Sequence, residues 1–191
     1  MNLPNKLTVG RIIATPLFMA ALMFNFPYHY TAALFLFIAA SLTDMLDGKI
    51  ARKHNLITNF GKFLDPLADK MLTTAAFLGF IYAGIGWQIT WITFIVLFRE
   101  FLVSSLRLVV VTSGGEVIAA NMWGKCKTVT QMAGIILALA SYAVIDDFSV
   151  ASVAPVLDVL ISIVLWISAI LCVISGGIYL AQSSKYIDSS K

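Results

Sequence analysis

Charge is scarce in this sequence. Only 12% of the 191 residues are Asp, Glu, Lys or Arg, whereas 60% are hydrophobic and the mean hydropathy is +0.91. A soluble domain usually carries about a quarter charged residues, so a water-soluble protein is disfavoured. The apolar residues run continuously instead of alternating in short segments, which also disfavours a transmembrane barrel. The composition therefore predicts an all-α integral membrane protein. The net charge of +3 is small, and we expect no nucleic-acid partner.

Cysteine is nearly absent as well. The two cysteines, Cys126 and Cys172, form no Cys-x-x-Cys spacing and have no histidine nearby in the sequence. We therefore expect two free thiols.

Long apolar runs, in contrast, are abundant, and we predict six transmembrane helices. Each run has the length that a helix needs to cross a bilayer core, about 20 residues. No linker, repeat or low-complexity tract separates them, so we expect residues 1–191 to form one membrane domain. The first run shows no cleavage site of a signal peptide and is read as an uncleaved helix. The predicted spans are residues 7–26, 31–53, 66–84, 87–111, 128–145 and 155–181.

The cations lie on alternate connections. Lysine and arginine are absent from "NFPYHY", "YAGIGW" and "VIDDFSVASVAP", whereas the connections before residues 66 and 128 and both termini contain them. Cytoplasmic loops are enriched in Lys and Arg. The pattern predicts a multi-pass protein of the inner (cytoplasmic) membrane with both termini in the cytoplasm.

Four aspartates stand at the predicted cytoplasmic ends of the second and third spans, in "DMLDGKIARKHNLITNFGKFLDPLAD". Asp44 and Asp47 are three residues apart, and Asp65 and Asp69 four apart, so each pair shares one helix face. Four carboxylates near a membrane are costly unless they are neutralised. Two divalent cations with oxygen ligands, such as Mg²⁺ or Mn²⁺, would neutralise them. Alternatively, the aspartates pair with neighbouring Lys and Arg residues in a hydrated loop. We also expect Pro66 in the first turn of the third span, with Asp65 near its cap.

The same stretch resembles the signature of the CDP-alcohol phosphatidyltransferase family, D-x-x-D-G-x-x-A-R, then eight residues, then G-x-x-x-D-x-x-x-D. All eight signature positions are present: Asp44, Asp47, Gly48, Ala51, Arg52, Gly61, Asp65 and Asp69. The resemblance implies six transmembrane helices around a polar cavity that faces the cytoplasm.

The resemblance further implies a division of roles within the site. The four aspartates would bind two divalent cations, Mg²⁺ or Mn²⁺, and Asp69 would also act as the general base. The N-terminal segment "NLPNKLT" would lie at the membrane surface. The residues expected to bind the nucleotide and diphosphate of the donor are Asn5, Thr8, Gly48, Arg52, Thr58 and Gly61.

Further cations point to a phosphorylated acceptor. Arg99 and Arg107 lie on the fourth predicted span, and Lys125 and Lys127 precede the fifth. Arginine inside an apolar helix implies a hydrated cavity or an anionic partner, and guanidinium groups bind phosphate well. The four cations are therefore our candidates for binding the acceptor's phosphate. Alternatively, Glu100 neutralises an arginine and Lys127 anchors the helix at the membrane surface.

The segments "NLPNKLTVGRI", "REFLVSSLR" and "GKCKTVTQ" resemble the phosphatidylglycerophosphate synthases within that family. The implied reaction transfers phosphatidyl from CDP-diacylglycerol to sn-glycerol 3-phosphate, and the implied partners are these substrates and the bilayer. In this family the sixth helix can also support a homodimer. Two alternatives stay open: another acceptor such as serine or inositol phosphate, and a divalent-cation transporter.

Overall fold

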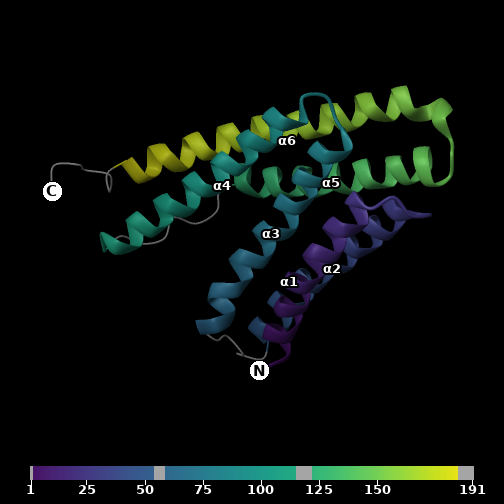
Figure 1. Ribbon diagram of the computed structural model, residues 1–191. Helices are drawn as coiled ribbons and strands as arrows, with labels where there is room; N and C mark the ends of the chain where they lie inside the picture. Colours follow the sequence, from purple (N-terminus) through teal and green to yellow (C-terminus); the bar gives the residue numbers. More distant parts are fainter. Residues whose placement is uncertain (1, 54–58, 115–121, 185–191) are drawn as a thin grey trace.

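The computed structural model describes residues 2–53, 59–114 and 122–184; the side chains of residues 3, 45–53, 59, 60, 62, 63 and 65 are outside this description. All regular structure in these ranges is helical (Figure 1). A π-helical turn, Ala143–Asp147, and a short 3₁₀ helix, Ala151–Val153, connect the last two long helices. The long helices are α1 (Leu3–Met23), α2 (His29–Lys53), α3 (Asn59–Ala83), α4 (Ile89–Thr112), α5 (Met122–Tyr142) and α6 (Ala154–Ser183).

The six predicted helical segments are confirmed as helices, but the start of α3 was predicted wrongly. The helix begins at Asn59, so Pro66 lies inside it and not in its first turn, and Asp65 is not near a cap. A proline removes one backbone donor and tends to kink a helix, a cost that packing against neighbouring helices offsets. Pro16 is accommodated inside α1 in the same way.

The N-terminal residues belong to α1 itself. The Asn2 side chain accepts a hydrogen bond from the backbone N–H of Asn5 (3.3 Å), and Pro4 stands in the first turn. Both features are typical of helix starts. The segment expected at the membrane surface therefore forms the first turns of a continuous helix.

The helices form two groups of three. Helix α1 packs against α2 and α3, while α6 packs against α5 and α4; α2 with α5 and α3 with α4 connect the groups. Figure 1 shows α5 and α6 side by side along most of their length. The two helices leave little room at Gly134, where an added Cβ would lie 2.9 Å from Cδ2 at the end of the Leu165 side chain.

Apolar side chains fill the interior and also cover the outside. In the interior, the Phe18 and Phe37 rings lie 5.6 Å apart and are fully buried. Outside, a stripe on α4 is at least 58% exposed and comprises Trp91, Phe94, Phe98 and Phe101. An exposed apolar stripe of this kind indicates a membrane or a partner.

Three helical segments in the described ranges are long and apolar enough to cross a membrane. They are Pro4–Met23, Met122–Asp147 and Ala151–Ser183. Together with the exposed apolar surface, they make this chain a membrane protein. The two cysteines, as expected, are free thiols.

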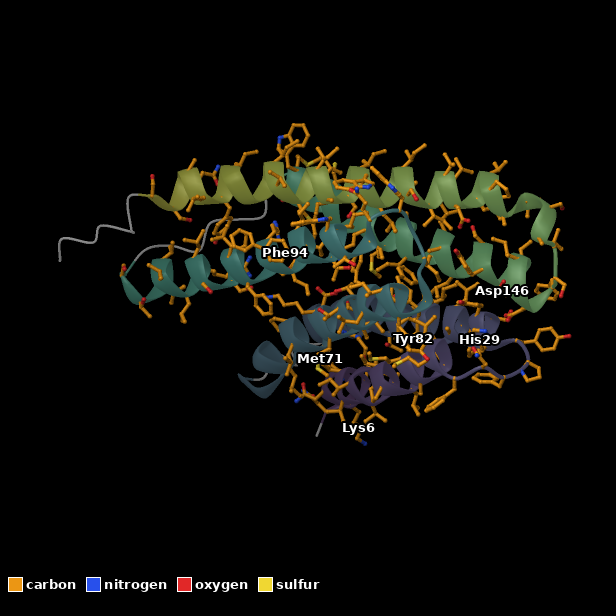
Figure 2. The ribbon with its side chains drawn as sticks, turned by 45° about the horizontal axis from the view of Figure 1, so that its top comes forward. Lys6, His29, Met71, Tyr82, Phe94 and Asp146 are labelled. Carbon is orange, nitrogen blue, oxygen red and sulfur yellow. The ribbon has the colours of Figure 1, made fainter. Side chains whose placement is uncertain are left out.

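At one end of the bundle, the Asp147 carboxylate connects the π-helical turn after α5 to the start of α2. Asp147 accepts hydrogen bonds from the backbone N–H and the hydroxyl of Thr31, both at 2.7 Å. Thr31 lies in the first turn of α2, where backbone N–H groups lack partners within the helix. His29 and Asp146 lie at this same end (Figure 2) and border a common pocket. The contact therefore attaches the α5–α6 connection to the start of α2.

Replacing Asp147 with alanine should destabilise the protein. The variant leaves the Thr31 amide without its charged acceptor, and we expect a loss of about 1–3 kcal/mol in the free energy of unfolding. Thermal unfolding in detergent micelles measures the change. Asp146→Ala is the matched control, since Asp146 is exposed, and it should change stability by less than about 0.5 kcal/mol. Equal effects of the two substitutions would contradict the role given to Asp147.

Candidate active site

Asp44 is held by an arginine from another helix. The Arg11 guanidinium on α1 donates to the Asp44 carboxylate on α2. The Arg11 side chain is only 1% exposed, whereas that of Asp44 is 46% exposed. One side of the carboxylate is thus fixed by a buried cation while another faces open space. Arg11 is one of the N-terminal cations that indicate the topology, and the sequence did not predict a role for it in the site. Its place within an apolar span was the signal of such a role.

Asp69 lies within electrostatic range of Asp44. Asp69 is on α3, and its carboxylate also interacts with the charges of Lys127, Glu100 and Arg11. Aspartates of α2 and α3, 25 positions apart in the sequence, thus face a common region. The packing of α1 against both helices brings them there.

The structure describes only some of the other residues expected to bind the metal ions and the nucleotide of the donor substrate. Asp47, Gly48 and Arg52 lie on α2, and Asp65 on α3, but their side chains are outside the described part of the structure. Thr58 lies outside the described residues altogether. Gly61 is buried on α3. Among the side chains that the structure describes, no three of His, Cys, Asp or Glu form a group able to hold a metal ion. The four-aspartate site therefore stays a prediction.

Glu100 is the centre of a second charged cluster. Its carboxylate on α4 accepts from the Lys127 ammonium on α5 and from Nη1 of Arg99, the latter at 3.3 Å. Arg99 also donates through Nε to the Ser175 hydroxyl on α6 (3.2 Å). The Arg99 stem passes Gly176, where an added Cβ would lie 3.2 Å from its Cγ. One carboxylate and one arginine therefore connect α4, α5 and α6.

The four cations expected to bind the phosphate of the acceptor substrate divide into two pairs. Arg99 and Lys127 meet at Glu100, and the Lys127 side chain is only 8% exposed. Arg107 and Lys125 are exposed and do not join this cluster. Of the alternatives, Glu100 does pair with an arginine. Lys127 is an interior residue, so it is not a surface anchor.

Asp69 and the Glu100–Lys127 pair border the same small pocket. Lys70 lies beside Asp69 and donates to the Ser104 hydroxyl of α4, which donates in turn to the Glu100 carbonyl (2.6 Å). The sequence analysis gave no role to Lys70 or to Gln131. The residues that line the pocket are Asp69, Lys70, Thr73, Glu100, Lys127, Thr128, Gln131 and Met132.

Asn5 and Thr8, predicted to bind the nucleotide, are buried in the first turns of α1. The Thr8 hydroxyl donates to the Pro4 carbonyl (3.1 Å). Both residues lie on the same helix as Arg11, one to two turns before it. Their proximity to a donor stays a prediction.

The whole arrangement combines carboxylates with buried cations inside a helical membrane bundle. The chain matches the CDP-alcohol phosphatidyltransferase family over residues 1–175. It belongs to this family.

Three named relatives are similar to this chain over at least 97% of its length. The chain is 38% identical to the CDP-diacylglycerol–glycerol-3-phosphate 3-phosphatidyltransferase of Bacillus subtilis (strain 168), covering 99% of this chain and 98% of that protein. It is 38% identical to the protein of the same name in Rickettsia bellii, covering 97% of each. It is also 35% identical to a probable phosphatidylglycerophosphate synthase of Mycobacterium tuberculosis, covering 97% of this chain and 83% of that protein. These names favour a transferase over a cation transporter.

Replacing Glu100 with glutamine should destabilise the bundle. Arg99 and Lys127 would lose their shared carboxylate, and an uncompensated buried charge costs about 3 kcal/mol or more. We expect a clear fall in the thermal unfolding midpoint in detergent. Asp158→Asn is the control, because in the described structure the Asp158 carboxylate pairs with no cation and accepts a neutral hydrogen bond from the Tyr142 hydroxyl (3.0 Å). A loss for Glu100→Gln no larger than that of the control would contradict a central role for the cluster.

Proposed function

We propose that this protein transfers the phosphatidyl group of CDP-diacylglycerol to sn-glycerol 3-phosphate, with phosphatidylglycerol phosphate and CMP as products. The observation that carries the proposal is the pocket in which Asp69 lies next to the Glu100–Lys127 pair. A carboxylate able to take a proton and a cation able to hold a phosphate are the two groups that a phosphorylated alcohol needs. The names of the near full-length relatives support the same substrates.

The donor side rests on the aspartates. Asp44 and Asp69 offer carboxylate oxygens from two helices, without His or Cys, and this donor set fits Mg²⁺ or Mn²⁺ better than Zn²⁺. With Asp47 and Asp65 they would hold two divalent cations, which when bound neutralise the diphosphate and make its phosphorus more electrophilic. Arg11 keeps the Asp44 carboxylate oriented. The donor nucleotide would be bound by Asn5 and Thr8 on α1, Gly48 and Arg52 on α2, and Gly61 on α3, together with Thr58, which lies outside the described residues.

The acceptor side rests on the cations. Arg99 and Lys127 bring two positive charges to the single negative charge of Glu100, so the cluster keeps a net charge of +1 for a phosphate. Arg107 and Lys125 would add to the attraction from the cytoplasmic side. With its phosphate held there, the acceptor would present a hydroxyl to Asp69.

The chemical step follows from this placement. Asp69 takes the proton of the acceptor's hydroxyl, as a positioned carboxylate does in general base catalysis. The hydroxyl oxygen forms a bond to the phosphorus of the phosphatidyl group, the bond from that phosphorus to the oxygen bridging it to CMP breaks, and CMP leaves.

The membrane setting completes the proposal. All six helices would span the inner membrane as a single domain, residues 1–191, with both termini and the pocket on the cytoplasmic side. An apolar groove of about 590 Å³ between α1, α3 and α4 supports access for lipid tails, because it passes Lys70, next to Asp69. Its lining includes Ile12, Met19 and Phe101. The exposed faces also allow a homodimer.

The acceptor is tested by a panel of alcohols. Purified protein is incubated with CDP-diacylglycerol and Mg²⁺ or Mn²⁺ together with sn-glycerol 3-phosphate, serine or inositol phosphate, and CMP and lipid products are measured. We expect products with sn-glycerol 3-phosphate only, and none after chelation of the metal. Lipid formed from serine or inositol phosphate alone would sink the acceptor assignment and leave the family reaction intact.

The base is tested by Asp69→Asn. The amide keeps the shape of the side chain but does not take a proton, so turnover should fall by at least 100-fold while the KM for CDP-diacylglycerol changes much less. Asp146→Asn, at the opposite end of the bundle, should leave both parameters unchanged. Normal turnover in the Asp69 variant would remove Asp69 from the role of base.

A further inference from the structure

Gln131 is a buried amide whose side-chain oxygen has no hydrogen-bond partner within the described part of the structure. The residue is 3% exposed, and its Oε1 accepts no hydrogen bond from any described residue. Buried polar atoms in folded proteins nearly always have a partner. Because Gln131 also lines the small pocket beside Asp69, its unpaired carbonyl points to a donor that arrives with a ligand.

The position of Gln131 narrows the identity of that donor. It lies on α5 one turn after Lys127, on the same helix face. Both residues line the pocket that also contains Asp69 of α3 and Glu100 of α4. A ligand that reaches Lys127 with an anionic group and Asp69 with a hydroxyl would thus have Gln131 beside it.

The proposed acceptor has one group not yet assigned. In sn-glycerol 3-phosphate the phosphate suits the cations at Glu100, and the primary hydroxyl reacts at Asp69. The secondary hydroxyl, on the carbon between them, is a donor without a partner. A neutral amide oxygen is a suitable acceptor for it, because it satisfies the hydroxyl without competing for the reacting proton.

We propose that Gln131 determines acceptor specificity by accepting a hydrogen bond from the hydroxyl that lies between the reacting hydroxyl and the phosphate. This inference rests on the proposed function and adds a residue to it. The selected class of acceptor is a three-carbon phosphate with a free secondary hydroxyl. A site built to bind a hydroxyl discriminates strongly against the analogue that lacks it, because its polar group is then left unpaired.

The test compares two acceptors. One is sn-glycerol 3-phosphate, and the other is 3-hydroxypropyl phosphate, which keeps the primary hydroxyl and the phosphate but lacks the secondary hydroxyl. For the wild-type protein we expect kcat/KM to favour the first by about 10- to 100-fold. In Gln131→Met, which has a similar shape and no amide, the preference should fall to within about threefold.

Two further variants make the test specific. Met132→Leu changes a neighbouring residue of the pocket lining without changing any hydrogen-bonding group, and it should keep the wild-type preference. Gln131→Asn keeps the amide but withdraws it by one methylene, and it should lose most of the preference. Thermal unfolding and the KM for CDP-diacylglycerol identify variants that fold correctly, so the Asn variant carries the test if the Met variant does not fold.

The outcomes separate the two proposals. A wild-type protein that uses both acceptors equally well, or a folded Gln131 variant that keeps the full preference, overturns the role of Gln131 and leaves the reaction standing. Lipid formed from neither acceptor, but from serine or inositol phosphate, overturns the proposed function and this inference with it. If the Gln131 variants lose the preference while Met132→Leu keeps it, the result supports the role proposed for Gln131.

Discussion

The packing of α4, α5 and α6 depends on one largely buried carboxylate, that of Glu100, whose side chain is 18% exposed. Glu100 sits where α4, α5 and α6 meet and holds Lys127 directly, while Arg99 extends from it to Ser175. None of these charges is tolerated alone in an apolar interior, because each loses its water and only a partner compensates. The carboxylate needs the cations and the cations need the carboxylate. The contact that holds α4, α5 and α6 together therefore also forms part of the pocket lining. Arg11 and Asp44 repeat the arrangement on a smaller scale between α1 and α2.

Each charged contact lies inside one helix group: Arg11 and Asp44 pair between α1 and α2, and the Glu100 cluster lies among α4, α5 and α6. The outer faces meet lipid and are lined by apolar residues such as those of the α4 stripe. Charged side chains are then stable only where helices cover them, or near the membrane surface. Asp69 lies between the two contacts and interacts with the charges of both. The constraint that makes the fold stable in a membrane therefore also concentrates the reactive groups.

Stability and reactivity make different demands on these groups. The Glu100 carboxylate is engaged by cations, which suits a structural element that also leaves one positive charge in excess. Asp69 is exposed and forms no ion pair in the described part of the structure, which suits a group that must exchange a proton with a ligand. Gln131 is neutral and buried, which suits recognition more than proton transfer.

The sequence alone determined the class of protein, the six helices and the residue types of the donor site, because span length, hydropathy and the spacing of Asp44 to Asp69 are local properties of the chain. It missed the early start of α3, since Pro66 is a helix breaker by itself and is accommodated only in a packed bundle. It also did not show which cations are paired. Lys127 reaches Glu100 across 27 positions and Arg11 reaches Asp44 across 33, on different helices. Only the tertiary structure decided those pairings and the burial of Gln131, because the cost of an unpaired charge or carbonyl exists only once packing has removed the water.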